Sequence, residues 1–305
     1  MVWLRSWDST RLFVFICCSI LLLSIPLEGQ ITAIIPGKFF SVGTAGSGSI
    51  IELKRDDSGN LLALMESIPI RIIKIKADGS ESGEFDIESS GFDIASDMFI
   101  SGVHEIILTS PWSGELKRFS LKRGILPSLI PETGGREFRP ISAVLTRDSK
   151  LFVINDADSD VWTVNSDGRA FPAHWSRNSG GVLDNPQHID YSLQANKLII
   201  LDGDVLRIFE PFSQPGTGIK TSMEAPTNLG VLGNEVWVSG EGLSCFSIKE
   251  SSLLFSIPAD SLKSWNIYPL TDVLPLNEDR LAVVSRTGSK GLFLKIIRKV
   301  QGNPE

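Results

Sequence analysis

Three polar residues of different chemistry occupy equivalent places in the sequence: His188, Asn228 and Asp272. Each lies eight to ten residues before a short apolar run. An imidazole, an amide and a carboxylate can bind a polar ligand or form a small catalytic group if the fold brings them together. Because buried polar groups need hydrogen-bond partners anyway, a structural ring of hydrogen bonds with trapped water is the alternative.

The elements that must position these residues are six short apolar runs. The runs begin at Leu61, Ile106, Leu151, Leu198, Val236 and Leu281, so that successive starts lie 45, 45, 47, 38 and 45 residues apart. A period of about 40 to 50 residues is typical of the four-stranded blades of a β-propeller. A chain from about residue 30 to 305 accommodates six such repeats and not seven. We therefore predict an all-β, single-domain, six-bladed β-propeller with four antiparallel strands in each blade.

The third repeat, residues 148–168, shows the unit most clearly. Its sequence DSKLFVINDADSDVWTVNSDG holds two short β-branched and aromatic runs separated by acidic turn residues, which is the pattern of a hairpin. The last repeat lacks an outer strand, whereas residues 31–35 form a strand-like run without a hairpin partner. We expect this N-terminal strand to complete the sixth blade and close the ring, because closure leaves no open sheet edge.

With LFVINDADSDVWTVNSDG in view, the third repeat resembles the NHL and gluconolactonase-like group of six-bladed propellers. The resemblance implies the fold, and propellers host both enzymes and binding modules. At the level of the period it covers residues 50–299.

One branch of that group, the calcium-dependent lactonases, implies a testable ligand set. Members are similar in placing Asn or Asp directly after a proline at the start of several inner strands, and Glu at the start of the first. Here Ile141, Gln187 and Thr227 follow the matching prolines, and the first inner strand, entered through residues 46–49, has no Glu at its start. Calcium takes about six to eight oxygen ligands. A lactonase-like hydrolase with calcium is therefore the alternative function, with Asn228 and Asp272 as its only candidate ligands.

The turns after the apolar runs are acidic in five repeats, which predicts an acidic rim on one face of the propeller. We expect this interaction rim to include Glu115, Asp156, Asp158, Asp160, Asp202, Asp204 and Glu241. The spacing of Asp156, Asp158 and Asp160 is that of a calcium loop, but Val161 stands where such a loop needs glycine, so a solvated turn is preferred. Acidic residues are common in turns for local reasons, which is the alternative for the whole rim.

The longest segment between repeats, residues 171–187, should reach the same rim. It carries His174, Trp175 and Arg177, which are side chains of the kind enriched at recognition sites. The alternative is an ordinary outer strand with Trp175 wedged between blades.

Composition and the N-terminus limit the partners. A net charge of −7 argues against nucleic acid, whose binding depends on Lys and Arg. Arg5 and Arg11 precede 16 uncharged residues, 12–27, which are short for a membrane span of about 20 residues. We predict that residues 1–29 form a signal peptide, with an uncleaved membrane anchor as the alternative. The protein is then secreted or periplasmic, in the cell envelope, and Cys245 remains as its only cysteine.

The sequence contains no nucleophile elbow, paired-histidine zinc motif or phosphate loop. Our main hypothesis is an exported propeller that binds a protein or a small polar ligand through its acidic rim and the 171–187 segment, without an obligatory cofactor.

Overall fold

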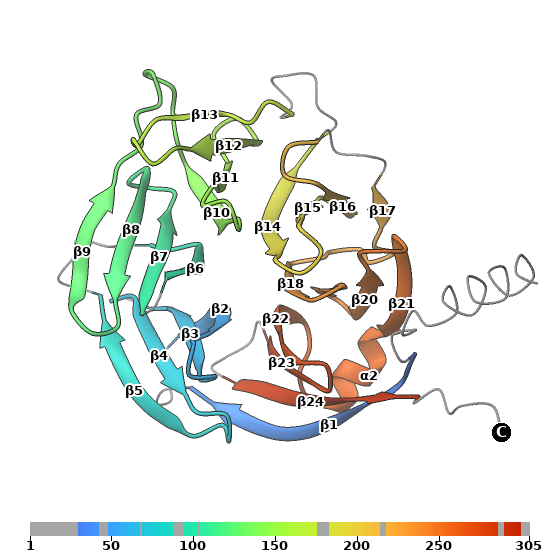
Figure 1. The fold of residues 1–305 in the computed structure, drawn as a ribbon. Helices are drawn as coiled ribbons and strands as arrows, with labels where there is room; N and C mark the ends of the chain where they lie inside the picture. Colours follow the sequence, from blue (N-terminus) through green and yellow to red (C-terminus); the bar gives the residue numbers. More distant parts are fainter. Residues whose placement is uncertain are drawn as a thin grey trace, which may run out of the picture.

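The computed structural model describes residues 30–42, 48–67, 69–87, 94–102, 104–175, 183–213, 218–285 and 290–299. Within these residues the chain forms six four-stranded antiparallel sheets. Figure 1 shows the sheets arranged as blades in a ring around a central axis. This confirms the predicted six-bladed β-propeller. We call the interior along the central axis, which the innermost strands face, the central channel.

Each of the first five blades uses four consecutive strands, with the first strand innermost. Blade one consists of β2 (Ser49–Arg55), β3 (Leu61–Glu66), β4 (Arg71–Ile75) and β5 (Glu81–Asp86). Blade two consists of β6 (Asp97–Gly102), β7 (Glu105–Ser110), β8 (Glu115–Ser120) and β9 (Gly124–Leu129). Blade three consists of β10 (Pro140–Leu145), β11 (Leu151–Asn155), β12 (Asp160–Val164) and β13 (Ala170–Pro172).

The fourth and fifth blades repeat this order. Blade four consists of β14 (Pro186–Ser192), β15 (Lys197–Asp202), β16 (Val205–Phe209) and β17 (Ile219–Lys220). Blade five consists of β18 (Asn228–Leu232), β19 (Glu235–Ser239), β20 (Leu243–Ser247) and β21 (Ser252–Ile257). A short helix, α2 (Ala259–Ser264), leads into the last blade. The six apolar runs of the sequence are the second strands of the blades.

Blade six joins the two ends of the described chain. It contains β22 (Leu270–Asn277), β23 (Arg280–Ser285) and β24 (Lys290–Arg298), and its outermost strand is β1 (Ile31–Ser41). β1 runs antiparallel to β24, from the Ile31 and Arg298 pair to the Ser41 and Lys290 pair. A sheet made from both ends of a chain closes the ring, because neither end leaves a blade incomplete.

The hydrophobic core lies between the blades. Each pair of neighbouring blades shares a buried apolar cluster, for example Phe152, Ile154 and Ile189 between blades three and four. The innermost strands are therefore held at fixed positions around the channel. Among the described residues, no helix combines the length and apolar character needed to cross a membrane.

Candidate functional site

Six buried polar side chains, one from the inner strand of each blade, point toward the central channel. We call them the channel ring: Glu52, Asp97, Ser142, His188, Asn228 and Asp272. The structure places all three polar residues singled out in the sequence on this ring. It adds Glu52, Asp97 and Ser142, which the sequence analysis missed.

β-bulges aim several of these side chains. In β2 the register with the neighbouring strand shifts between Ile50 and Glu52, directly before the ring residue. The same shift precedes Ser142, His188 and Asp272 in their strands. A bulge re-aims the next side chain, which explains how polar residues on apolar strands come to face the channel.

Two ring carboxylates fasten one blade to the next. Oδ2 of Asp97 accepts a hydrogen bond from the backbone N–H of Ala143, in the following blade, at 3.0 Å. Oδ2 of Asp272 accepts one from the backbone N–H of Leu53, in blade one, at 2.6 Å. These residues therefore have a structural role whatever else the channel does.

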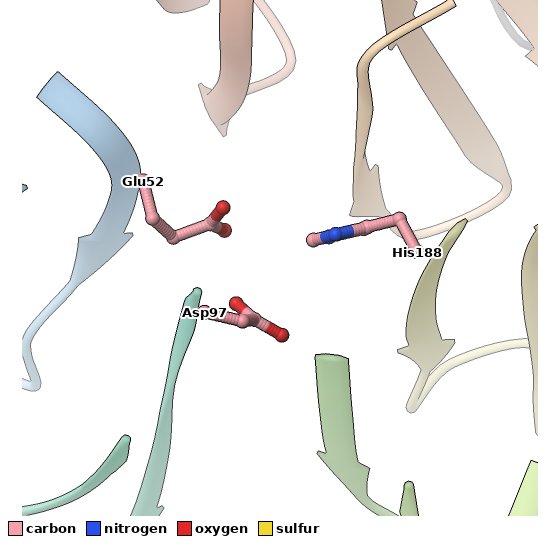
Figure 2. Close-up of side chains that lie close together, drawn as sticks. All are labelled: Glu52, Asp97 and His188. Atoms are coloured by element: carbon pink, nitrogen blue, oxygen red, sulfur yellow. The ribbon is translucent and has the colours of Figure 1, made fainter. Parts of the chain in front are cut away.

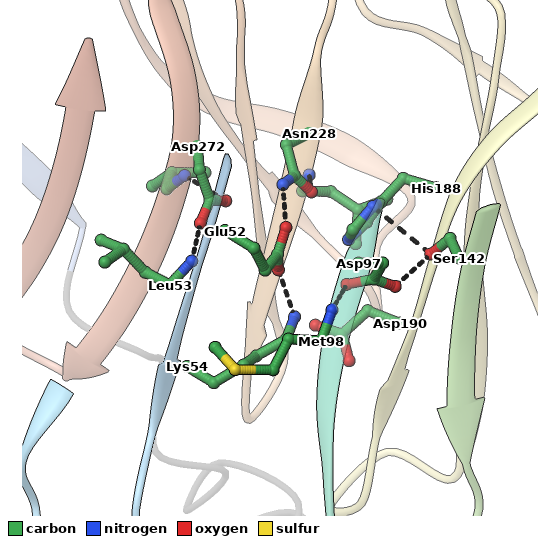
Figure 3. Close-up of polar contacts among 12 residues, drawn as sticks. Glu52, Leu53, Lys54, Asp97, Met98, Ser142, His188, Asp190, Asn228 and Asp272 are labelled. Carbon is green, nitrogen blue, oxygen red and sulfur yellow. Dashed lines mark hydrogen bonds and ion pairs between the residues drawn. The ribbon is translucent and has the colours of Figure 1, made fainter. Parts of the chain in front are cut away.

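Glu52 has two side-chain partners inside the channel (Figure 3). Its Oε2 accepts a hydrogen bond from Nδ2 of Asn228 at 2.6 Å. Its Oε1 lies 2.5 Å from Nζ of Lys54, which follows two residues later on the same strand. Glu52 therefore joins an amide from blade five to the one ammonium group of this network.

His188 faces Glu52 and Asp97 across the channel (Figure 2). One carboxylate oxygen of each acidic residue and one imidazole nitrogen of His188 lie within 4.8 Å of one another. Nδ1 of His188 lies 3.4 Å from Oγ of Ser142, whose hydroxyl donates to Oδ2 of Asp97 at 2.7 Å. Nε2 of His188 is buried and has no hydrogen-bond partner among the described residues. We call Glu52, Asp97 and His188 the ligand triad.

The channel carries more negative than positive groups. Burial, reinforced by the charge of Asp272, raises the pKa of Glu52 well above its usual range. Burial raises the pKa of Asp272 to about 7 and also raises the pKa of Asp190, and in both cases Lys54 opposes the change. Burial lowers the pKa of His188 to about 4, so its imidazole is neutral at pH 7. A cation entering the channel would relieve the repulsion among these carboxylates.

The ring residues missed in the sequence had a detectable signal. Glu52, Asp97 and Ser142 each lie nine residues before the apolar run of their repeat. An offset of eight to ten residues had identified the ring residues of the last three blades. Extending it to the first three repeats would have completed the ring.

As the sequence indicated, β2 has no Glu among its first three residues, Ser49 to Ile51, but Glu52 is its fourth residue. Glu52 lies near the beginning of β2 and faces the channel after the bulge. The positions directly after the prolines, Ile141, Gln187 and Thr227, are not ring residues. Because a bulge follows the prolines in β10 and β14, the channel-facing position comes one residue later than the lactonase pattern implies.

Most of the acidic rim residues have local partners. Glu115 pairs with Lys117 at 2.6 Å, and Asp204 pairs with Lys220 at 3.3 Å. Asp156 is exposed and lies 3.6 Å from Nη2 of Arg139. Their charges are partly neutralised within the same blade or by the preceding loop.

Other rim residues lie below the surface. Asp160 and Asp202 are buried, and Oδ1 of Asp202 accepts hydrogen bonds from the backbone N–H groups of Asp184 and Asn185. This arrangement fixes the loop that enters blade four. Glu241 is partly exposed in the turn before β20.

Asp158 also has its partners within the same turn. It is partly buried and accepts hydrogen bonds from Nε1 of Trp162 and Nδ2 of Asn155. These contacts agree with the interpretation of this segment as a turn.

The described part of the 171–187 segment likewise contains both buried and exposed side chains. Trp175 is fully buried, donates from Nε1 to the carbonyl of Pro211 at 2.8 Å and packs edge-on against Phe209. These contacts agree with the alternative that Trp175 is wedged between blades. His174 is exposed, with a ring nitrogen 3.1 Å from the carbonyl of Phe212. Arg177 lies outside the described residues, as do residues 1–29.

Comparisons with known proteins support the fold. No family model matches the chain, and no curated protein matches its sequence. A streptogramin B lyase structure is similar with a TM-score of 0.59 at 9% identity, covering 87% of this chain and 98% of that one. A catalytically inactive virginiamycin B lyase from Staphylococcus aureus with quinupristin gives 0.58 at 12% identity, covering 87% and 100%.

A protein of unknown function from Bacteroides thetaiotaomicron gives a TM-score of 0.61 at 8% identity, covering 87% of this chain and 76% of that one. At such low identities these similarities establish a shared six-bladed propeller architecture. Function on this fold must be argued from the site.

Proposed function

We propose that this protein is a binding propeller whose central channel takes a divalent cation, with Glu52, Asp97 and His188 as ligands, and through it a small polar ligand. The observation that carries this proposal is Nε2 of His188. It is buried without a hydrogen-bond partner among the described residues and belongs to a residue clustered with two carboxylates. Buried polar atoms normally have partners, so an orphaned imidazole nitrogen beside two carboxylates is a donor available to a cation.

The donor set indicates which cations fit. Neutral imidazole is a ligand for zinc and other transition metals, whereas calcium prefers sites built from oxygen alone. His188 is in the neutral form at pH 7, since burial lowers its pKa to about 4. We therefore favour Zn²⁺ or Mn²⁺ over the Ca²⁺ expected from the lactonase resemblance. Such a cation would supply a Lewis acid that holds an oxygen of the ligand.

Thermal denaturation tests the proposal. The full chain is treated with chelator and then titrated with Mn²⁺, Zn²⁺ or Ca²⁺. A cation that binds only the folded state stabilises it by about 2.7 kcal/mol at a concentration 100-fold above the dissociation constant. We expect a clear rise in Tm with Mn²⁺ or Zn²⁺ that is lost in His188→Gln and kept in His174→Gln, the matched change at an exposed histidine. No shift with any cation would overturn the proposal.

A second candidate is a metal-dependent hydrolase of the lactonase kind. Asp272 favours it, because a carboxyl group with a pKa of about 7 can exchange protons near neutral pH. The propellers of similar fold include lyases, so enzymatic chemistry is compatible with this architecture. Hydrolysis of simple lactones that requires Mn²⁺ or Zn²⁺ and is lost in Asp272→Asn would favour this candidate. Cation binding without turnover would favour the binding propeller.

The acidic rim and export remain part of the proposal. The carboxylates of Asp156 and Asp204 are exposed, so these two rim residues are available to a protein partner. Retention of a partner by wild type but not by the double variant with both residues changed to Asn would support a rim interaction. Export through residues 1–29 is tested by fractionating cells that express the full chain and determining the N-terminus of the mature protein.

A further inference from the structure

A second polar layer lies directly below the ligand triad. Lys54 and Asp190 each follow a ring residue by two positions, Lys54 after Glu52 on β2 and Asp190 after His188 on β14. Alternate residues of a strand share a face, so these two side chains enter the same channel one step deeper. Figure 3 shows them approaching each other from the two strands.

The ammonium group of Lys54 forms an ion pair with an oxygen of Glu52 that is a ligand of the proposed cation site. Nζ of Lys54 lies 2.5 Å from Oε1 of Glu52. A divalent cation that uses this oxygen would meet a positive charge at contact distance. Like charges so close are strongly unfavourable in a partly buried site, so the ammonium group must withdraw before Glu52 can bind the cation fully.

Asp190 offers the withdrawn ammonium group a second partner. Its Oδ1 accepts a hydrogen bond from the backbone N–H of Tyr191 at 2.7 Å. Among the described residues, no cationic side chain lies within ion-pair distance of its carboxylate. Lys54 is already near enough to lower the pKa of Asp190, against the larger effect of burial. The lysine side chain has four flexible methylene groups, so a change of rotamer can move its ammonium group by several ångströms.

We propose that Lys54 is a built-in competitor of the cation. Its ammonium group pairs with Glu52 when the site is empty of metal and moves to Asp190 when the triad binds a divalent cation. This inference rests on the proposed function, because it presumes cation binding by the triad. Lys54 and Asp190 would then set the affinity of the site for cations. Only a cation that binds strongly enough to displace the ammonium group from Glu52 would be retained.

The other charged groups facing Lys54 do not offer the same exchange. Asp97 accepts hydrogen bonds from Ser142 and from the backbone of Ala143, and Asp272 accepts one from the backbone of Leu53. Moving Lys54 to either would leave it within the ring rather than below it. Asp190 is the carboxylate of the deeper layer.

Isothermal titration of the full chain with Mn²⁺ and with Zn²⁺ tests this inference. We expect Lys54→Met to bind the cation about 10-fold more tightly than wild type, within the usual range of coupling between two ligands. Asp190→Asn should bind more weakly, because Lys54 then has no second partner. In the Lys54→Met background the Asp190→Asn change should have a much smaller effect, since the two residues act together. Lys220→Met, at an exposed lysine paired with Asp204, is the matched control and should bind like wild type.

The outcomes separate the inference from the proposed function. If neither wild type nor any variant binds Mn²⁺ or Zn²⁺, the proposed function fails. If wild type binds and Lys54→Met binds with equal or lower affinity, competition by Lys54 is excluded. If Asp190→Asn weakens binding equally with and without Lys54, then Asp190 acts through its own charge and the exchange is wrong. Lys54→Gln, which keeps a polar group beside Glu52, replaces Lys54→Met in the same cycle if the methionine variant does not fold.

Discussion

Nδ2 of Asn228 donates a hydrogen bond to Oε2 of Glu52 at 2.6 Å and thereby joins blade five to blade one across the channel. Blade six lies between these two blades in the ring, so this contact spans the channel rather than following the strands around it. The amide is a neutral donor that holds one ligand oxygen of the triad. A carboxylate in place of the Asn228 amide would repel Glu52 instead of donating a hydrogen bond to it.

Asn228→Asp should therefore lower stability without metal and increase the response to metal. The change places a carboxylate beside the buried Glu52, and leaving a charged group without a suitable partner costs about 1 to 3 kcal/mol or more. A divalent cation bound by the triad would offset the added charge. We expect a lower Tm in chelator and a larger rise with Mn²⁺ than wild type shows. Asn277→Asp, at an exposed position of β22, is the control. Equal Tm values for Asn228→Asp and wild type in chelator would contradict this account of the contact.

Ser142 should be the most important hydroxyl group of the channel. It donates to Asp97, accepts from the backbone N–H of Ile189 at 3.2 Å and lies beside Nδ1 of His188. Ser142→Ala leaves buried polar groups without partners, at a cost of about 1 to 3 kcal/mol. Urea denaturation measures the loss. Ser113→Ala, at an exposed serine, should cost much less, and equal costs would show that the Ser142 contacts contribute nothing specific.

The fold could be predicted largely from the period of the apolar runs. That period reflects the second strand of each blade, which is buried on both faces and so reads as a continuous apolar segment, as β11 and β19 do. Inner strands are less regular, because they mix buried apolar residues with one polar side chain aimed at the channel.

The channel site was only half predicted for the same reason. His188, Asn228 and Asp272 stood out by their offset from the apolar runs, an offset that Glu52 shares. The bulge that turns Glu52 into the channel, however, is set by the pairing of β2 with β3 and has no signature of its own in the sequence. Contacts between blades, such as the one from Asn228 to Glu52, join residues 176 positions apart and depend on ring closure. Lys54 would be read as an exposed strand residue until the opposite side of the channel is in place.

The dependence of stability on pH should follow opposing groups in the channel. The pKa of Asp272 is raised from 3.8 to about 7 in the folded protein, so its stabilising contribution is full below 3.8 and is lost as pH rises through 7. The pKa of His188 is lowered from 6.5 to about 4, so its contribution is full above 6.5 and is lost as pH falls through 4. A tenfold difference in proton affinity between the folded and unfolded protein corresponds to about 1.4 kcal/mol.

In chelator, the two variants should therefore depart from wild type in opposite directions. His188→Gln removes the contribution that grows with pH, so between about pH 4 and 6.5 its free energy of unfolding should decrease relative to wild type as pH rises. Asp272→Asn removes the contribution that declines with pH, so its free energy of unfolding should increase relative to wild type up to about pH 7. Denaturation in urea at a series of pH values measures all three proteins. Parallel profiles for wild type and both variants would contradict these directions of the pKa changes.

The close contact between Gly291 and Phe40 should make the stability of the closed ring sensitive to the side chain at position 291. These residues lie opposite each other on β24 and β1, and a Cβ atom at position 291 would lie only 2.1 Å from Cζ of Phe40. The Phe40 ring is buried against Phe293, with ring centroids 4.8 Å apart, so it cannot move without disturbing the core between blades six and one. Gly291→Ala should cost about 1 to 3 kcal/mol, the range of overpacked cores. Gly102→Ala, where an added Cβ meets no atom within 4 Å, is the control.

In a Phe40→Leu background the smaller side chain makes room, and Gly291→Ala should then cost clearly less than it does beside Phe40. An unchanged cost in that background would place the effect in the strand backbone rather than in the contact between the two ends of the chain.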